Sequence, residues 1–182
     1  MTAPLQSPPR RALADGIAPP LAHVDGWPVH LANLDEILEA VIGAASRNEG
    51  FLYAPLNVDL LVKLRRDKGF AEAMRRARFV NADGWPVAML GRRENASIER
   101  LTGADTILPL CKICAERGLA IYLFGTSPEV LARASKELEQ RFPGLQIAGS
   151  ESPPLGFDPR SAVADAAIER IAASRARLCF LA

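Results

Sequence analysis

The fold is decided between residues 55 and 105, by Pro55-Leu56-Asn57-Val58-Asp59, Asn81-Ala82-Asp83-Gly84-Trp85-Pro86 and Thr102-Gly103-Ala104-Asp105. Each of these polar stretches follows an apolar or extended run and opens an amphipathic segment. In an open α/β sheet this is the carboxyl end of a strand, which is where ligands bind. A carboxylate on a glycine turn, flanked by an amide and a second Gly-x-Asp turn, favours a sugar or nucleotide site over a packing role.

Apolar runs and amphipathic segments alternate through most of the chain, which predicts strands that alternate with helices. The expected strands cover residues 51–54, 78–81, 119–124, 145–148 and 177–181. The expected helices cover residues 58–66, 70–76, 86–90, 104–117, 127–141 and 161–175. This pattern predicts an α/β fold with a mostly parallel, Rossmann-like sheet flanked by helices.

The N-terminal part departs from this alternation. Residues 1–20 contain five prolines and no sustained apolar period, which predicts a disordered arm. Asp25-Gly26 separates apolar runs and predicts a tight β-hairpin. Asn33, with Glu36 three residues later, resembles a capping box and predicts a helix start. We expect residues 21–182 to form a single domain and, because the chain ends directly after an apolar strand, to be a C-terminally truncated fragment.

The composition excludes several classes of function. The 182 residues are 49% hydrophobic and 24% charged, as in a soluble globular protein, and a net charge of +1 does not attract nucleic acid. The sequence has no apolar run of about eighteen residues, and no apolar segment follows Arg10-Arg11 as an export signal requires. Basic residues nevertheless cluster locally, and the preferred interpretation is that they form solvated helix faces. The alternative is a rim that attracts phosphates or an anionic membrane. These residues are Lys63, Arg65, Arg66, Lys68, Arg75, Arg76, Arg78, Arg92 and Arg93.

The cysteines are predicted to be structural. Cys111 and Cys114 lie inside a helical pattern, and the only histidines, His23 and His30, are distant in sequence. A redox or zinc site needs partner ligands or an exposed helix start, so buried thiols are the preferred interpretation. The pattern indicates no metal site and suits the reducing cytosol.

Asp83 is the candidate catalytic residue. A general base must present its carboxylate to a hydroxyl from a rigid position, and Gly84 lets another molecule approach the backbone closely. The alternative, of equal weight, is that Asp83 caps the next helix. The pentapeptide Asp-Gly-Trp-Pro-Val occurs at residues 25–29 and again at 83–87. The first copy is predicted to form a hairpin, so only the second is well placed for chemistry.

The other candidates would bind substrate. Asn57 suits sugar hydroxyls or a phosphate, although a helix cap is slightly favoured. Thr102, Gly103 and Asp105 open a long helix whose first amides could hold a phosphate, although capping is the more common role. Gly125-Thr126 forms a similar turn. These turns lack the G-x-G-x-x-G fingerprint and the P-loop lysine, which disfavours nicotinamide cofactors and ATP hydrolysis, and no Ser-His-Asp or Cys-His arrangement can be assembled.

Taken together, the motifs resemble glycosyltransferase family 26, which includes the N-acetylmannosaminyltransferases of wall teichoic acid and enterobacterial common antigen synthesis. The resemblance covers roughly residues 22–182 and is carried by motifs in the family's order and spacing: Asn57-Val58-Asp59, Arg65-Arg66-Asp67, Ala82-Asp83-Gly84, Thr102-Gly103-Ala104-Asp105, Phe124-Gly125 and Phe142-Pro143-Gly144-Leu145. It implies inverting transfer of an N-acetylmannosamine-like or other hexose from a UDP-sugar to a polyprenyl-diphosphate-linked acceptor, with no metal or other cofactor. It also implies a cytoplasmic protein, peripheral at the inner face of the cell membrane, that acts in cell-surface polysaccharide synthesis.

The resemblance implies roles for single residues as well. The family's proposed catalytic base falls on Asp83 and its site amide on Asn57, and the residues Gly84, Thr102, Gly103, Asp105, Gly125 and Thr126 complete the expected substrate-binding set. A site threonine of the family is replaced by Pro55, which removes a hydroxyl contact. The family continues into a Pro-Lys-Gln-Glu loop and a basic appendage, which this sequence does not include, so weak or absent turnover is expected.

Two alternatives stay open. A non-catalytic module that binds a nucleotide sugar or a protein partner is favoured by Pro55 and by the end of the chain. A nicotinamide-dependent oxidoreductase is disfavoured by the missing fingerprint. The sequence identifies neither the donor sugar nor the acceptor lipid, and it leaves a homo-oligomeric state open.

Overall fold

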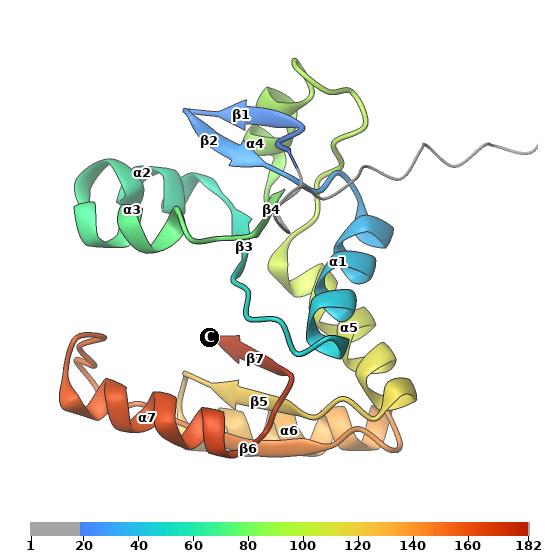
Figure 1. Cartoon of the computed structure of the whole chain (residues 1–182), viewed down its shortest axis with the longest axis vertical. Coiled ribbons are helices and arrows are strands. Elements are labelled where there is room, and N and C mark those ends of the chain that lie inside the picture. The colour runs from blue at the N-terminus through green and yellow to red at the C-terminus, as the bar shows by residue number, and fades with distance from the viewer. Residues whose placement is uncertain (1–18, 182) are drawn as a thin grey trace, which may run out of the picture. The chain divides into compact units, whose positions relative to one another are not determined.

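The computed structural model describes residues 19–181 and divides the chain into two compact units. Within the described residues, unit 1 contains residues 19–33 together with Phe51–Leu101, and unit 2 contains Leu34–Gly50 together with residues 102–181. Both units combine strands with helices (Figure 1), so the predicted α/β class is confirmed. The arm expected over residues 1–20 lies outside the described residues, apart from its last two prolines.

Unit 1 begins with the predicted hairpin. Strand β1 (Ala22–Val24) pairs antiparallel with β2 (Trp27–Val29), and the turn residues Asp25 and Gly26 have φ angles of 54° and 78°. Two consecutive positive φ angles are required by the common two-residue hairpin turn. The Arg65 guanidinium donates two hydrogen bonds to the Asp25 carboxylate, at 2.6 and 2.8 Å, and so ties the turn to helix α2 (Val58–Arg66).

Two parallel strands form the centre of unit 1. Strand β3 (Tyr53–Leu56) pairs with β4 (Phe79–Ala82), and α2 and α3 (Lys68–Met74) connect them. Helix α4 (Trp85–Gly91) comes after β4 and packs against the hairpin strand β1. The ladder begins with Tyr53 opposite Phe79, two residues later than the sequence pattern predicts for this strand, because pairing with β4 rather than local apolar content sets the strand's start.

The core of unit 1 joins the hairpin to these elements. Its fully buried members come mainly from β1, β2, β3, β4 and α4, among them Val24, Val29, Leu56, Val80 and Val87, and Ile98 joins them from the loop after α4. The two residues that follow β2 lie beside β4. The amides of His30 and Leu31 donate to the Val80 carbonyl at 2.8 and 3.1 Å. The hairpin is therefore built into the same core as the parallel strands.

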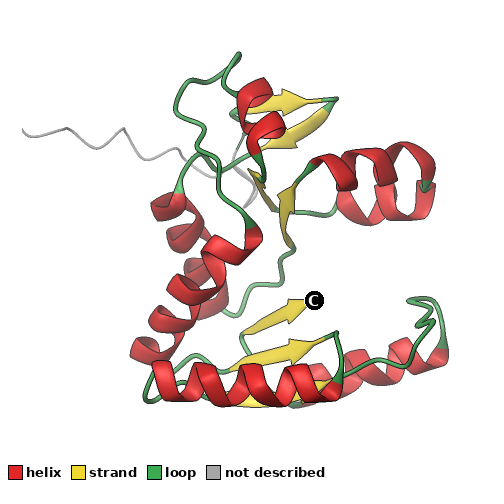
Figure 2. Cartoon of the chain, turned by 180° about the vertical axis from the view of Figure 1, so that it is seen from behind, coloured by secondary structure: helices red, strands yellow, loops and turns green. Residues whose placement is uncertain are grey.

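Unit 2 contains a three-stranded parallel sheet with the order β6-β5-β7. Its elements are α1 (Leu34–Ser46), α5 (Gly103–Arg117), β5 (Ile121–Phe124), α6 (Pro128–Arg141), β6 (Ile147–Glu151), α7 (Ala162–Ala173) and β7 (Leu178–Leu181). Helices α6 and α7 lie on opposite faces of this sheet (Figures 1 and 2), and α1 packs against α5. The predicted parallel strands flanked by helices are thus present in this unit.

The helices of unit 2 begin and end with standard signals. Ser127 and Ser161 cap α6 and α7 with their hydroxyl oxygens, and Pro128 occupies the first turn of α6, where it fits because its missing N–H would be unbonded anyway. Gly118 ends α5 with a φ of 63°, a left-handed conformation that glycine adopts without strain. These signals explain why the helix boundaries lie close to the predicted ones.

Strands β5 and β6 approach each other tightly at Gly149. A Cβ atom at this position would lie 2.5 Å from the Cε2 atom of Tyr122 on the neighbouring strand. The register between the two strands also shifts next to Tyr122. The Tyr122 ring therefore occupies the space that any side chain at position 149 would need.

The cysteines of α5 are core residues, as predicted. Cys111 and Cys114 are fully buried, and burial raises the pKa of the Cys111 thiol to about 11 and that of Cys114 to about 12. Thiols with such pKa values remain protonated and are poor nucleophiles at neutral pH. Within residues 19–181, no helix is long and apolar enough to cross a bilayer.

Candidate active site

The predicted site residues of unit 1 meet at one edge of its parallel strands. Leu56 lies opposite Ala82 at the carboxyl ends of β3 and β4, so Asn57 and Asp83 are each the next residue along neighbouring strands. The Asp83 amide continues the ladder by donating to the Leu56 carbonyl at 2.8 Å. The structure therefore brings Asn57, Asp83 and Gly84 together at the edge where α/β proteins bind ligands.

Asp83 does not cap helix α4. The N-cap position of α4 is occupied by Gly84, and no side chain bonds to the first amides of this helix. The Asp83 side chain is half-buried, and among residues 19–181 its carboxylate has no hydrogen-bond or ion-pair partner. It is thus a rigidly mounted carboxylate whose oxygens remain available to a ligand.

Gly84 creates the corner on which Asp83 stands. Its φ of 81° and ψ of 156° fall in a region that only glycine adopts readily. A Cβ atom at this position would meet only the Pro86 Cδ atom, at 3.9 Å, so the backbone angles and not crowding require glycine. Pro86 then occupies the first turn of α4, where it fixes the helix start directly after the corner.

Asn57 takes the structural role that the sequence slightly favoured. It is the N-cap of α2, and its Oδ1 atom accepts a hydrogen bond from the Leu60 amide at 2.9 Å. Its Nδ2 amide group has no partner among the described residues, and the side chain is half-buried. Asn57 can therefore cap the helix and still donate hydrogen bonds toward a ligand.

Asn81, to which the sequence assigned no role, helps to hold the neighbouring segments at this edge in place. Its side chain is 1% exposed, accepts a hydrogen bond from the Tyr53 hydroxyl at 2.9 Å and donates to the Leu101 carbonyl at 2.7 Å. The Leu101 amide donates in turn to the Ala82 carbonyl at 3.2 Å. This network fixes the segment that ends at Leu101 beside β4. The sequence signal for this network is an asparagine in a strand whose other residues are apolar.

The remaining predicted residues belong to unit 2, and two of them bond to each other. Thr102 Oγ1 accepts from the Asp105 amide at 3.2 Å, and Asp105 Oδ2 accepts from the Thr102 amide at 2.8 Å, which is a complete capping box at the start of α5. The amides of Gly103 and Ala104, by contrast, have no partner in the described part of the chain. Free amides at a helix start can hold an anion.

The turn after β5 is less open to an anion. The buried Gly125 has a φ of 125°, and its amide donates to the Glu151 carbonyl at 3.0 Å. Thr126 has a φ of 46°, and its carbonyl accepts from the Ser152 hydroxyl at 2.5 Å. The Glu129 carboxylate lies at the start of α6, where hydrogen bonds from the Ser127 hydroxyl and its own amide lower its pKa. A negative charge therefore already occupies this helix start.

A polar group that sequence reasoning did not find lies at the end of β6. The Arg170 guanidinium donates to both Glu151 carboxylate oxygens, at 2.5 and 2.9 Å, and chiefly for this reason the pKa of Glu151 is lowered. Burial and the nearby Glu151 charge raise the pKa of Tyr122, whose hydroxyl lies 3.4 Å from that carboxylate. Glu151 is thus held ionised by its own neighbours, and no local sequence pattern links it to Arg170.

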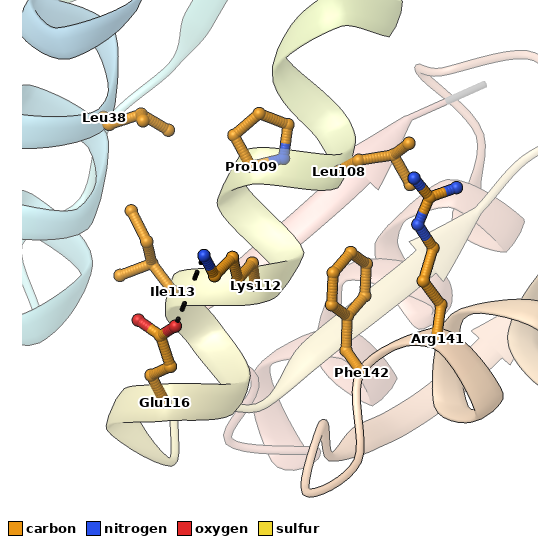
Figure 3. Close-up of a pocket in the computed structure, with 8 residues that line it drawn as sticks. All are labelled: Leu38, Leu108, Pro109, Lys112, Ile113, Glu116, Arg141 and Phe142. Carbon is orange, nitrogen blue, oxygen red and sulfur yellow. Dashed lines mark ion pairs between the residues drawn. The ribbon is translucent and has the colours of Figure 1, made fainter.

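Unit 2 also contains a hollow of about 440 Å³ on the side of α5 (Figure 3). Its lining comes from α1, α5 and the end of α6, and comprises Leu38, Leu108, Pro109, Lys112, Ile113, Glu116, Arg141 and Phe142. Lys112 and Glu116 form an ion pair with each other at 3.9 Å. None of the predicted site residues lines this hollow, and across residues 19–181 no three His, Cys, Asp or Glu side chains are grouped to hold a metal ion.

A sequence model of the glycosyl transferase WecG/TagA/CpsF family matches residues 22–182. The match includes every residue assigned to the site above and all the strands and helices of both units. Proteins of this family are glycosyltransferases of cell-surface polysaccharide synthesis. The chain belongs to the WecG/TagA/CpsF family of glycosyl transferases.

Proposed function

We propose that the protein transfers a hexose, with inversion, from a UDP-sugar to a polyprenyl-diphosphate-linked sugar acceptor. Family membership supports the reaction class, and one observation carries the assignment of the base. The Asp83 carboxylate stands at the carboxyl end of β4 beside Asn57, half-exposed and not used as a helix cap. A carboxylate that is held at a fixed backbone position and has no competing partner is suited to accept a proton from an alcohol.

In the proposed reaction the acceptor hydroxyl oxygen attacks the anomeric carbon of the donor and forms the new glycosidic bond. The bond between that carbon and the UDP oxygen breaks, and UDP leaves with the electron pair. Asp83 takes the hydroxyl proton. Because attack and departure occur on opposite faces of the sugar ring, the configuration inverts. The free Nδ2 amide group of Asn57 is placed to donate a hydrogen bond to a sugar oxygen beside Asp83.

For the donor diphosphate we propose the start of α5. The Gly103 and Ala104 amides have no partner in the described chain, and the helix dipole favours an anion there. Thr102 and Asp105 shape this turn through their capping box, so their role is to position the amides. The Gly125-Thr126 turn is the weaker candidate. The Gly125 amide is already bonded, and Glu129 places a carboxylate at the start of α6, the helix that follows this turn.

We further propose that helix α4 contacts the inner face of the membrane and so brings Asp83 to a lipid-linked acceptor. The Trp85 and Met89 side chains, one turn apart, are 58% and 45% exposed. The Arg92 guanidinium lies 5.4 Å from the centroid of the Trp85 ring, and Arg93 is exposed beside it. Exposed aromatic and apolar side chains next to arginines suit an interface with anionic lipids.

The base assignment is tested with Asp83→Asn. The amide keeps the shape of the side chain but cannot take a proton, so turnover should fall by about 10²- to 10⁴-fold while the Kd for the UDP-sugar changes little. Transfer is measured with a set of UDP-hexoses that includes UDP-N-acetylmannosamine and with polyprenyl-diphosphate-linked sugars. The matched control is Asp59→Asn on the exposed face of α2, which should retain full turnover. An Asp83→Asn protein with full turnover would remove the assignment.

The donor site is tested independently with Ala104→Glu. Residue 104 is exposed in the first turn of α5, where a carboxylate is favourable for the helix but repels a diphosphate. UDP binding, monitored by ligand-observed NMR, should weaken at least about tenfold on electrostatic grounds. Val163→Glu adds the same carboxylate at the corresponding position of α7 and should leave UDP binding unchanged. Equal effects of the two substitutions would argue against α5 as the donor site.

The second candidate function is binding of a nucleotide sugar without transfer. It is favoured by Pro55, which lies in β3 opposite Asn81 and offers no side-chain hydroxyl at the strand end that carries Asn57. Binding of a UDP-sugar that is unaffected by Asp83→Asn, with no transfer to any acceptor tested, would support this candidate over the enzyme.

A further inference from the structure

The first copy of the repeated pentapeptide borders a cavity that the proposed transfer reaction does not use. The cavity has a volume of about 410 Å³ and lies within unit 1, among the hairpin, the end of α3 and β4. The lining residues that matter here are Trp27, Pro28, His30, Met74, Arg75 and Val80. Most of this surface is apolar, and His30 and Arg75 bring the only ionisable side chains to it.

His30 is a buried polar group without a partner. Its side chain is 6% exposed, and its Nδ1 atom is fully enclosed and forms no hydrogen bond with any described residue. The backbone of the same residue is fixed, since its amide donates to the Val80 carbonyl at 2.8 Å. A buried ring nitrogen left unbonded is unfavourable, because folding removes its water and supplies nothing in return. His30 lines the cavity, so rotation of its imidazole about the Cβ–Cγ bond would turn this nitrogen toward a ligand there, which would supply the missing hydrogen bond.

Arg75 adds an uncompensated positive charge at the same cavity. Its side chain is exposed, and its guanidinium lies 5.7 Å from the centroid of the Trp27 ring. Among residues 19–181 it has no acidic partner, and no acidic side chain lines the cavity. Asp25, which precedes the lining residue Gly26, is already bound by two nitrogens of the Arg65 guanidinium. The hairpin is therefore held in place by one arginine, while a second arginine is left free at the cavity.

We propose that this cavity binds a small organic anion, a carboxylate or phosphate monoester carried on a flat apolar body. The anionic group bonds to the Arg75 guanidinium and to His30, and the apolar body lies against Trp27, Pro28 and Met74. The buried nitrogen, the unpaired guanidinium and the apolar walls each match one part of such a molecule. The site is independent of the transfer reaction, because it includes neither Asp83 nor the start of α5.

The probes are phenyl phosphate and benzoate, with inorganic phosphate and benzyl alcohol as comparisons. The chain contains two tryptophans, so a Trp85→Phe background leaves Trp27 as the only indole and makes its fluorescence a direct report on the cavity. We expect saturable changes with phenyl phosphate or benzoate, and whichever binds more tightly identifies the anionic group. Benzyl alcohol should bind at least tenfold more weakly, and inorganic phosphate should also bind more weakly than phenyl phosphate.

Arg75→Gln should weaken binding of the preferred probe at least tenfold. Arg76→Gln removes the same charge from the next, exposed residue and should change the Kd less than twofold. In the full chain with its native tryptophans, the ¹⁵N resonance of His30 Nδ1 should move when the probe is added, and His30→Asn should weaken binding with the fold unchanged by circular dichroism.

Four results would overturn the proposal: no saturable binding of either aromatic anion, equal binding of benzyl alcohol, equal losses in the Arg75 and Arg76 variants, or an unmoved His30 resonance at saturation. Each is distinct from a failure of the transfer assay, because no UDP-sugar or lipid acceptor is present in these measurements.

Discussion

The two copies of Asp-Gly-Trp-Pro-Val show how little five identical residues determine. In both copies the glycine has a positive φ, 78° at Gly26 and 81° at Gly84. After Gly26 the chain enters strand β2, whereas after Gly84 it enters helix α4. The local sequence therefore specifies a glycine corner, and the segments on either side decide whether the chain continues as a strand or as a helix.

The carboxylates of the two copies differ just as clearly. Asp25 is bound by the Arg65 guanidinium, and this hydrogen bonding lowers its pKa. Asp83 has no partner among the described residues and stands at a strand edge beside Asn57. One aspartate stabilises the fold and the other is available for chemistry. The role of each aspartate therefore follows from its neighbours in the structure and not from the shared motif.

The largest expected effect comes from exchanging the two carboxylates for amides. Asp83→Asn should lower kcat by about 10²- to 10⁴-fold, because only this carboxylate is proposed to accept the acceptor's proton. Asp25→Asn, the same change in the twin sequence, should leave kcat within about threefold, since residue 25 is placed to pin a turn. Steady-state transfer assays on both variants check this. Equal losses would show that the pentapeptide acts through stability.

Alanine at either glycine corner should lower the free energy of unfolding. Gly84→Ala forces a side chain into φ and ψ values that are nearly exclusive to glycine, and it should cost about 1–3 kcal/mol of the free energy of unfolding. Gly26→Ala, in a two-residue hairpin turn, should cost about 1–2 kcal/mol. Urea unfolding monitored by circular dichroism measures both. A Gly84→Ala protein as stable as the parent would mean that the corner relaxes.

The tryptophans of the two copies should differ in their contribution to membrane binding. Trp85 is 58% exposed, whereas Trp27 is only half-exposed and lies against Arg75. Trp85→Gln should weaken sedimentation with phosphatidylglycerol vesicles about threefold to tenfold, in proportion to the apolar surface removed. Ile168→Gln, which removes an exposed apolar side chain from α7, should have no such effect. Loss of vesicle binding in both variants would point to general surface hydrophobicity.

The smallest effect concerns the residue after each copy, which is His30 in one case and Ala88 in the other. Burial, and to a lesser extent the nearby His23, lowers the pKa of His30 from its usual 6.5. The unfolded chain therefore binds a proton at a higher pH than the folded chain does, and stability is lost as the pH falls below about 6.5. His30→Asn should reduce this loss between pH 7.5 and 5.5.

Urea midpoints at three pH values within that interval measure the effect. His23→Asn is the control, because it removes an exposed imidazole and should keep most of the parent's dependence. Identical slopes for the parent and His30→Asn would show that the His30 imidazole does not bind a proton differently in the two states.

Much of the fold could be predicted because its signals are local. The Asp25-Gly26 hairpin, the helix over Val58–Arg66 and the end of α5 at Gly118 all depend on turn residues, caps and apolar periodicity. The division into two units could not be predicted in this way. It depends on contacts between distant segments, such as α1 with α5, which no window of neighbouring residues contains.

The candidate site was only partly predictable, for a chemical reason. The residue types that cap helices also bind sugars and phosphates, so the sequence could not separate the two roles at Asn57, Asp83 or Asp105. The structure shows Asn57 and Asp105 bonded as caps and leaves the start of α4 without a side-chain cap. Asn81 and the Glu151–Arg170 pair escaped notice because their partners lie far away in sequence.

The close contact between Gly149 and the Tyr122 ring has an evolutionary consequence. Since any side chain at position 149 would collide with that ring at 2.5 Å, the two positions cannot drift independently. Among homologues, a larger residue at the first should accompany a smaller one at the second. This pair should therefore stand out as a covarying couple that reports the β5–β6 register, a constraint of ancestry that is separate from catalysis.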